Sequence, residues 1–345
     1  MGEEWVTDVL GAPFERLTLP LGTDDEGEVV ATLVRLLPTT GFLGGIFGDR
    51  RPFADVDVLY VHGWSDYFFQ KRLARYWSDR GARFFALDLR KYGRSLRPGQ
   101  TPGFVANLDT YDEDIAAALA AMGGRAERGQ RRLVLFGHST GGLTLSLWAA
   151  RHPGSAAAVI LNSPWLEFQL SGISRAAIAP VVQLQARLRP LDVAPQIDLG
   201  FYTRAQTEVA DPADPVEVNL EWRPEQTMAV HAAWFNAVLD GHARVAAGLR
   251  IDAPICVLLS ARTAVPTRWS DDLTRADSVL VVDDIARASL KLGSSVTVER
   301  IDGALHDVFL SRHEAREDAY DRLDRWATGC LGPRHPSRTA NAGAG

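Results

Sequence analysis

The stretch that decides the fold of this 345-residue chain is Leu133-Val134-Leu135-Phe136-Gly137-His138-Ser139-Thr140-Gly141-Gly142. A short apolar run ends abruptly in Gly-x-Ser-x-Gly, and a helical pattern follows from Leu143 to Arg151. A strand that turns so sharply into a helix strains its central residue, and glycines on either side avoid collisions with neighbouring backbone. The turn would lift the Ser139 hydroxyl clear of the sheet, beside the amides that open the helix. The pattern therefore predicts a nucleophile elbow; the alternative is a structural turn in which Ser139 caps the helix.

Strand and helix patterns alternate on both sides of this stretch. Beyond the elbow itself, strands are predicted at residues 56–61, 83–89, 157–161, 255–259 and 296–301, and helices at 67–80, 115–122, 285–292 and 312–327. Asp109 is expected to cap the helix at 115–122, and Asp283 or Asp284 the helix at 285–292. Such alternation calls for an α/β fold with a mostly parallel central sheet and helices on both faces. Two antiparallel strands, at 14–21 and 29–37, are expected to precede it.

The regular pattern breaks down between residues 164 and 248. This stretch is rich in proline and aromatic residues, and helices are expected at Ala176–Leu188 and, with Pro224 in its first turn, at Glu225–Leu239. We therefore predict a core of residues 14–163 and 249–328 and an inserted, mainly helical cap of residues 164–248. Residues 332–345 are rich in Pro, Ser, Ala and Gly and are expected to be disordered.

Composition excludes several classes of protein. A formal net charge of −6 argues against a nucleic-acid partner, and the two cysteines form neither a disulfide framework nor a zinc cluster. The glycine-rich stretch 41–48 lacks the spacing of a phosphate-binding loop, so we expect a plain loop, no metal and no cofactor. The acidic N-terminus has no apolar signal region, and no apolar run approaches the roughly 20 residues of a membrane span. We expect a cytoplasmic protein with no integral membrane segment; the sequence leaves its oligomeric state open.

A serine hydroxyl needs a base near neutral pH, and a carboxylate must hold that base in the right tautomer. His306 follows the strand at 296–301 and a glycine turn, which is the place expected for the base after a serine elbow. His62 and His138 lie inside motifs and are expected to brace the elbow and its neighbouring loop. The other histidines fall on predicted helices, the cap or the tail, where a surface position is expected: His152, His231, His242, His313 and His335.

The carboxylate that would orient the histidine is harder to assign, because residues 260–264, after the strand at 255–259, contain no carboxylate. The candidates farther along the chain are Asp271, Asp272, Asp277, Asp283 and Asp284. Helix capping accounts for the last two, and the first two fall in a polar turn. Asp277 lies in an irregular segment held down by apolar residues, and we choose it by elimination.

The oxyanion of an acyl transfer needs amide donors. The backbone N–H of Thr140, at the helix start, and that of Trp64, after His62-Gly63 at a neighbouring strand end, are expected to supply them. In the cap, aromatic residues are expected to line an acyl pocket, and we assign substrate binding to Trp165, Trp234 and Phe235. For any single one of them, an ordinary core position is the alternative.

Four segments together resemble the signatures of α/β-hydrolases of the lysophospholipase and monoacylglycerol-lipase type: His62-Gly63-Trp64, the elbow, 276–280 and 303–310. Asp88 to Ser95 also resembles the D-x-R-x-x-G-x-S segment common in that family, and the likeness spans roughly residues 14 to 328. The resemblance implies a triad of Ser139, Asp277 and His306 and hydrolysis of a carboxylic ester, often a lipid monoester. The chain departs from most relatives in having Thr263 where they place the acid.

We therefore expect a serine hydrolase that cleaves a small acyl ester through an acyl-enzyme intermediate. One alternative is an aminopeptidase or amidase on the same fold, with Glu208, Asp211, Asp214 and Glu217 in the cap holding the substrate amine. Another is a non-catalytic binding protein that has kept the fold. Activity is expected to fall below about pH 6.5 as the histidine base becomes protonated.

Overall fold

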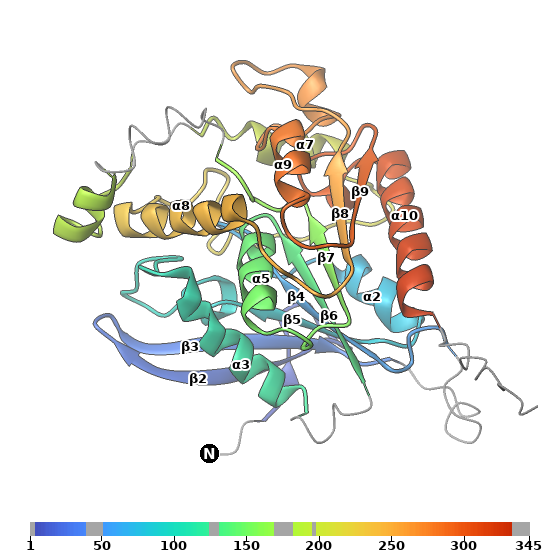
Figure 1. Cartoon of the computed structure of the whole chain (residues 1–345), viewed down its shortest axis with the longest axis horizontal. Helices are drawn as coiled ribbons and strands as arrows, with labels where there is room; N and C mark the ends of the chain where they lie inside the picture. The colour runs from blue at the N-terminus through green and yellow to red at the C-terminus, as the bar shows by residue number, and fades with distance from the viewer. Residues whose placement is uncertain (1–3, 39–50, 124–130, 169–181, 195–197, 333–345) are drawn as a thin grey trace, which may run out of the picture.

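The computed structural model describes residues 4–38, 51–123, 131–168, 182–194 and 198–332. Within these residues a single sheet of nine strands has the order β1-β2-β3-β5-β4-β6-β7-β8-β9 (Figure 1). The strands are β1 (Val6–Thr7), β2 (Glu15–Asp24), β3 (Gly27–Leu36), β4 (Val56–Val61), β5 (Arg83–Asp88), β6 (Arg132–His138), β7 (Ala158–Asn162), β8 (Ile255–Ser260) and β9 (Val296–Ile301). The loop at 41–48 and the tail at 333–345, both predicted from the sequence, lie outside the described residues.

The sheet has the mixed character that the sequence predicts. Neighbouring strands from β5 to β9 pair in parallel, whereas β1, β2 and β3 add an antiparallel edge that joins the sheet at β5. β6, which carries the elbow, lies between β4 and β7 near the middle of the sheet. The carboxyl ends of parallel strands form one edge, so the predicted site residues that follow β4, β6, β8 and β9 are brought to that edge.

Helices cover both faces of this sheet (Figure 1). On one face the apolar core includes residues of α3 (Tyr111–Ala121), α5 (Thr140–Arg151), α8 (Ala232–Ala247) and α9 (Val282–Ser289). On the other face it includes residues of α2 (Lys71–Asp79) and α10 (His313–Leu331). Side chains alternate between the faces along each strand: in β6, Leu135 belongs to the first core and Phe136 to the second. The central strands β4, β6 and β7 are therefore buried on both sides, and the elbow has a rigid base.

Both predicted helix caps are wrong. Asp109 does not cap α3; its carboxylate forms ion pairs with Arg151 and Arg244, and α3 begins after Thr110. Asp283 and Asp284 lie within the first turn of α9, where Val281 holds the capping position without a side-chain bond. The carboxylates pair with arginines instead: Asp283 with Arg300 of β9, and Asp284 with Arg287 of α9 itself.

Two helix starts were also predicted too early. α2 begins at Lys71 rather than at residue 67, because the carboxylate of Asp88 accepts the Phe68 N–H, at 2.9 Å, and holds that segment out of helix. The helix predicted at Glu225–Leu239 is α8, which begins at Ala232. The backbone directly before α8 is extended and pairs with another segment of the chain, through a β-bridge between Val193 and His231. Pro224 therefore does not open the helix.

The chain leaves the sheet after β7 and rejoins it at β8, and we call residues 164–248, which make up most of the intervening stretch, the cap segment. It contains α8 and also α7 (Phe201–Val209), a helix that the periodicity did not predict. Most of the helix predicted at Ala176–Leu188 lies outside the described residues, and its described part, 182–188, is helical. α8 packs on α5, so close that Gly241 approaches Leu143 and Leu147.

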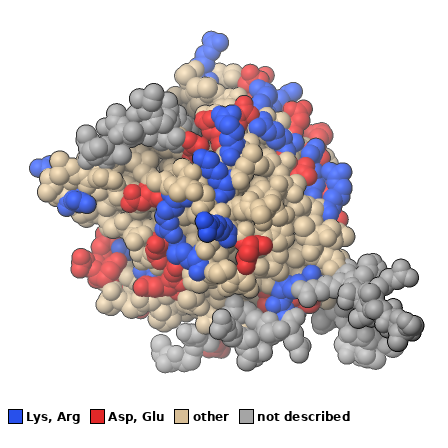
Figure 2. All heavy atoms as spheres, in the orientation of Figure 1, with Lys and Arg blue, Asp and Glu red and all other residues tan. Residues whose placement is uncertain are grey.

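Charged side chains are spread over the surface in mixed sign. Figure 2 shows lysine and arginine interspersed with aspartate and glutamate on the face seen in Figure 1. Ion pairs among the charged side chains of the protein include those of Arg72 with Glu317 and Arg322 with Glu299. This surface agrees with the small net charge of −6.

Candidate active site

Ser139 sits at a sharp, strained turn between β6 and α5. Its backbone has φ 49° and ψ −117°, a left-handed conformation that non-glycine residues rarely adopt. The turn is this tight because neighbouring backbones come very close: a Cβ on Gly141 would lie 2.2 Å from the His62 carbonyl oxygen, and one on Gly137 would lie 2.6 Å from the Gly142 Cα. The sequence expectation of a strand, an elbow and a helix is confirmed.

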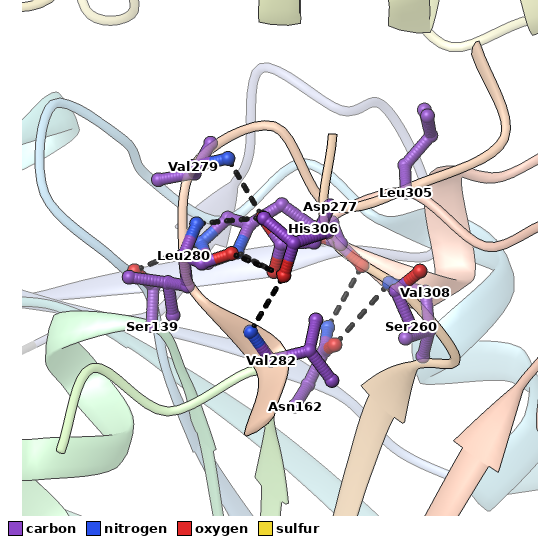
Figure 3. Close-up of polar contacts among 12 residues, drawn as sticks. Ser139, Asn162, Ser260, Asp277, Val279, Leu280, Val282, Leu305, His306 and Val308 are labelled. Atoms are coloured by element: carbon purple, nitrogen blue, oxygen red, sulfur yellow. Dashed lines mark hydrogen bonds and ion pairs between the residues drawn. The ribbon is translucent and has the colours of Figure 1, made fainter. Parts of the chain in front are cut away.

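The structure brings Ser139, His306 and Asp277 into one hydrogen-bonded line (Figure 3). His306 Nε2 lies 3.1 Å from Ser139 Oγ, and His306 Nδ1 lies 2.9 Å from Asp277 Oδ2. An ionised carboxylate can only accept hydrogen bonds, so Nδ1 carries the proton of a neutral imidazole and Nε2 is left to accept the serine O–H. The arrangement is that of a hydroxyl with a base in place to remove its proton.

Asp277 is fully buried and held by its own loop. Its Oδ1 accepts the N–H groups of Val279 and Leu280, at 2.7 and 2.8 Å, and this leaves Oδ2 to face the imidazole. These local bonds fix the carboxylate with Oδ2 toward His306 Nδ1. The remaining acid candidates lie elsewhere: Asp272, for example, forms an ion pair with Arg262 at the surface.

The loop after β8 explains how an acid so late in the chain reaches the site. Asp277 forms a parallel bridge with Thr263: its N–H donates to the Arg262 carbonyl, and its carbonyl accepts the Ala264 N–H. Thr263 in turn uses its hydroxyl to bond the Leu280 carbonyl and the Val282 N–H. The Asp277 carboxylate therefore lies directly beside the first residues after β8, where the sequence itself has no carboxylate.

The loop that carries His306 runs from β9 to the short helix η4 (Val308–Leu310) and is tied to its surroundings on several sides. Gly303 turns it with φ 69°, and Ser260 at the end of β8 donates its hydroxyl to the Ala304 carbonyl at 2.7 Å. Asp307 is buried and accepts hydrogen bonds from the side-chain amides of Gln70 and Asn162 (Figure 3 shows Asn162). Three elements of the core thus fix the backbone on either side of the imidazole.

The loop after β4 lies directly against the elbow. A Cβ on Gly63 would come within 3.0 Å of Ser139 Cβ, so the backbone that leads into Trp64 passes beside the serine. Thr140 is the first residue of α5, and its N–H is outside the helical i→i−4 ladder. Trp64 and Thr140 both line the same cavity as Ser139.

His62 and His138 brace this region, as expected. His62 Nδ1 bonds the Gly63 carbonyl and its Nε2 accepts the Leu89 N–H, at 3.1 Å, which requires a neutral ring. His138 contacts the Asn162 carbonyl, and burial lowers the pKa of both imidazoles. A surface position was expected for His242, and this is wrong: it is buried, and its Nε2 lies 2.8 Å from the Trp165 carbonyl oxygen.

A cavity of about 440 Å³ opens above Ser139, between the strand ends and the cap segment. Trp165 lines it, as predicted, together with further apolar residues: Trp64, Phe168, Leu199, Phe201, Val279 and Leu280. Trp234 and Phe235 are not among its lining residues, so the direct contact expected of them is corrected. Trp234 is fully buried and packs against Trp64 in a tilted arrangement, with ring centroids 3.8 Å apart, while Phe235 packs against Phe168. Both residues support the wall from behind.

Sequence reasoning missed the polar side of this cavity. Asp66, after β4, pairs with Arg223 of the cap segment at 3.0 Å, and burial raises the pKa of the Asp66 carboxyl. Tyr202 of α7 packs edge-on against His306, with ring centroids 5.7 Å apart. Tyr202 is one of the aromatic residues of the stretch 164–248, but nothing in the local sequence pattern places it beside the histidine.

A second cavity, of about 620 Å³, lies on the other side of α7. It contains three of the acidic residues expected to hold a substrate amine: Asp211, Asp214 and Glu217. Of these, Asp211 is paired with Arg316 and Asp214 with Arg72, while the fourth candidate, Glu208, pairs with Arg204. None of the four lines the Ser139 cavity.

Among the described residues, no group of three histidine, cysteine, aspartate or glutamate side chains gathers in a way that could hold a metal ion. No described helix has both the length and the apolarity to cross a membrane.

Most of the chain matches the model of a known protein family. Residues 54–312 match the Hydrolase_4 family, whose description is serine aminopeptidase, S33. The chain belongs to the Hydrolase_4 family. The match covers β4 to η4, and so includes the elbow, the cap segment, Asp277 and His306. A family of serine hydrolases agrees with the α/β-hydrolase fold described above.

Relatives and solved structures agree with this fold. Over 109 residues the chain is 34% identical to a non-heme haloperoxidase of Rhodococcus erythropolis, a match that spans 31% of this chain and about a third (34%) of the relative. A monoacylglycerol lipase of Paleococcus ferrophilus is 20% identical, with a TM-score of 0.59 over 79% of this chain and 94% of the lipase. A thermostable carboxyl esterase of Bacillus coagulans is 13% identical, with a TM-score of 0.64 over 92% of this chain and 99% of the esterase. These two structures share the α/β-hydrolase fold of this Hydrolase_4 chain.

Proposed function

We propose that this hydrolase cleaves a carboxylic ester through an acyl-enzyme intermediate. The observation that carries the proposal is the hydrogen-bonded line from Ser139 through His306 to Asp277. The solved structures that share this fold include a monoacylglycerol lipase and a carboxyl esterase, which favours the same reaction class. The apolar wall of the cavity favours a substrate whose acid part is greasy.

In the first half of the reaction, Ser139 Oγ attacks the carbonyl carbon of the ester while His306 Nε2 takes its proton. Asp277 holds the imidazole in the tautomer that leaves Nε2 free, and it stabilises the positive charge that forms. The carbonyl oxygen becomes an oxyanion, for which we assign the N–H groups of Trp64 and Thr140 as donors. Collapse of this intermediate breaks the bond to the alcohol oxygen, which receives the proton from His306.

In the second half, water replaces the alcohol. His306 Nε2 removes a proton from the water as its oxygen attacks the acyl carbon, and the same two N–H groups stabilise the second oxyanion. The bond between Ser139 Oγ and the acyl carbon then breaks, the serine regains its proton, and the carboxylic acid leaves. No cofactor takes part in this scheme. The cap segment, residues 164–248, would bind the acyl chain at Trp165 and its apolar neighbours.

The test is a panel of p-nitrophenyl esters of graded acyl length, with the wild-type protein and Ser139→Ala. Loss of the hydroxyl should lower kcat by several orders of magnitude on every ester that the wild type cleaves. A Ser139→Ala protein with near wild-type rates would overturn the proposal. Labelling by a fluorophosphonate probe, which needs an activated serine, separates this function from that of a non-catalytic binding protein.

Amide cleavage is the second candidate, because the family is described as serine aminopeptidases. Against it, the acidic residues expected to hold a free amine do not line the Ser139 cavity. Comparison of an amino-acid p-nitroanilide with a fatty-acyl ester decides between the two.

A cytoplasmic location, favoured by the free cysteines Cys256 and Cys330, stays a prediction.

A further inference from the structure

A continuous chain of polar contacts runs from the core, through the cap segment, and back to the core beside His306. Asp66 pairs with Arg223 Nε at 3.0 Å, and Arg223 Nη2 donates to Gln206 Oε1 at 2.7 Å. Gln206 Nε2 donates to the Tyr202 hydroxyl at 2.8 Å, and that hydroxyl also accepts the Asp307 N–H at 3.0 Å. We call these five residues the cap–core chain.

The cap–core chain forms the partition between the two cavities. Thr203 and Arg223 line both of them, whereas Tyr202 faces the Ser139 cavity and Gln206 faces the second one. The two ends of the cap–core chain lie in different loops of the core: Asp66 in the loop after β4 and Asp307 in the loop after β9. A ligand that fills the Ser139 cavity therefore contacts the same residues that join the cap segment to the core.

Tyr202 acts on His306 in two ways. Its hydroxyl bonds the peptide N–H that directly follows His306, which helps to fix the backbone from which the imidazole projects. Its ring packs edge-on against the imidazole at 5.7 Å and an interplanar angle of 76°, while His138 contacts the same imidazole from the core at 5.1 Å. An imidazole held between a core ring and a cap ring has little freedom to turn away from Ser139 Oγ.

We infer that Tyr202 is a positioning residue for His306, through which the seating of the cap segment completes the catalytic geometry. The inference rests on the proposed function, since it concerns the same serine and histidine. Binding energy that holds α7 on the core is then used to orient the base, so it raises kcat rather than only lowering KM. The cap segment is in this respect part of the catalytic apparatus and not only a wall for the acyl chain.

Tyr202→Phe is the sharpest test, because it removes the hydroxyl and keeps the ring. The Asp307 N–H then loses its acceptor, and we expect kcat on a p-nitrophenyl ester to fall about fivefold to tenfold, with KM changed less than about twofold. The rate at which a small fluorophosphonate labels Ser139 should fall by the same factor. That second readout does not depend on which ester is the natural substrate.

Tyr67→Phe is the matched control. The Tyr67 hydroxyl also accepts a backbone N–H across the boundary between core and cap segment, that of Asn219 at 2.8 Å, but it does not line the Ser139 cavity. We expect Tyr67→Phe to label at a rate within about twofold of wild type. If it slows labelling as much as Tyr202→Phe does, general loosening of the cap segment is the cause, and the inference is overturned.

A second variant tests the inference if Tyr202→Phe does not fold. Gln206→Met breaks the cap–core chain one link away from Tyr202, and we expect labelling to slow about threefold. Wild-type labelling rates in either folded variant overturn the inference while leaving the proposed function intact. A wild-type protein that the probe does not label contradicts the proposed function itself, and the inference falls with it.

Discussion

Asp277 lies beside Thr263 as a partner in a parallel β-bridge, and this pairing supplies the carboxylate that the loop after β8 lacks. The acid thus reaches the strand end through backbone hydrogen bonds rather than through its position in the sequence. Its two oxygens are divided between the loop amides and His306. A catalytic role for this carboxylate leads to the first prediction.

Asp277→Asn should lower kcat by about three to four orders of magnitude, because an amide at this place can favour the wrong imidazole tautomer. Asp272→Asn is the control: its carboxylate is mostly exposed and pairs with Arg262 at the surface. Steady-state hydrolysis of a p-nitrophenyl ester measures both variants. A folded Asp277→Asn enzyme with more than about a tenth of wild-type kcat would show that another residue is the acid.

Gly141→Ala should prevent folding or cost about 3 kcal/mol or more. The added methyl would lie 2.2 Å and 2.4 Å from the carbonyl oxygens of His62 and Val61, and main chain at the centre of the sheet has little room to move. Gly329→Ala, at an open position in α10, should be neutral or stabilising by up to about 1 kcal/mol. Thermal unfolding followed by circular dichroism compares the two, and equal melting temperatures would contradict the packing described at the elbow.

Stability should depend on pH through His62. Burial lowers the pKa of this imidazole, whereas in the unfolded chain it titrates near pH 6.5. The unfolded state therefore binds more protons below about pH 6.5, so the contribution of His62 to stability is complete above that pH and declines as the pH falls. Protonation would also break the hydrogen bond from the Leu89 N–H.

Comparison with His62→Asn isolates this effect from groups that titrate in the opposite sense. Burial raises the pKa of Asp114 to about 6, so acidification to that range favours the folded state at Asp114. Urea unfolding at pH 7.5 and 5.5 gives the loss of stability on acidification for each protein. The loss should be smaller in His62→Asn than in wild type, and equal losses would refute the prediction.

Trp165→Ala should weaken the preference for longer acyl chains. Trp165 lines the Ser139 cavity, and its removal takes apolar contact from the acyl part of the substrate. We expect kcat/KM for p-nitrophenyl octanoate to fall about tenfold relative to the acetate ester. Phe235→Ala is the control, since Phe235 lies behind the wall and should change that ratio less than about threefold. A larger effect from Phe235 would restore the sequence assignment that the cavity does not support.

The sequence predicted the parts of the molecule that depend on local pattern. The alternation of strands and helices and the turn at Ser139 follow from periodicity and from glycines that no larger residue could replace. His306 could be placed because a strand and a glycine turn immediately precede it. Each strand, helix or turn of this kind can be predicted from a short run of consecutive residues.

What the sequence did not predict depends on contacts between distant segments. The pairing of Thr263 with Asp277 and the place of Tyr202 beside His306 arise only when separate loops meet. The wrong cap at Asp109 has the same cause, because its carboxylate pairs with Arg151 and Arg244 of two other helices. Trp234, an aromatic residue of the cap segment, proved to be core packing under Trp64.

β7 and β8 are hydrogen-bonded neighbours, although residues 164–248 separate them along the chain. None of the described residues of that insertion contributes a strand to the sheet, so its length and composition can drift without disturbing any strand register. Substitutions within residues 164–248 can thus change which esters bind, while Ser139, Asp277 and His306 lie outside this stretch and stay the same. The hydrogen bond of the Tyr202 hydroxyl limits such changes, because an altered cap segment must still contact the peptide N–H that follows His306.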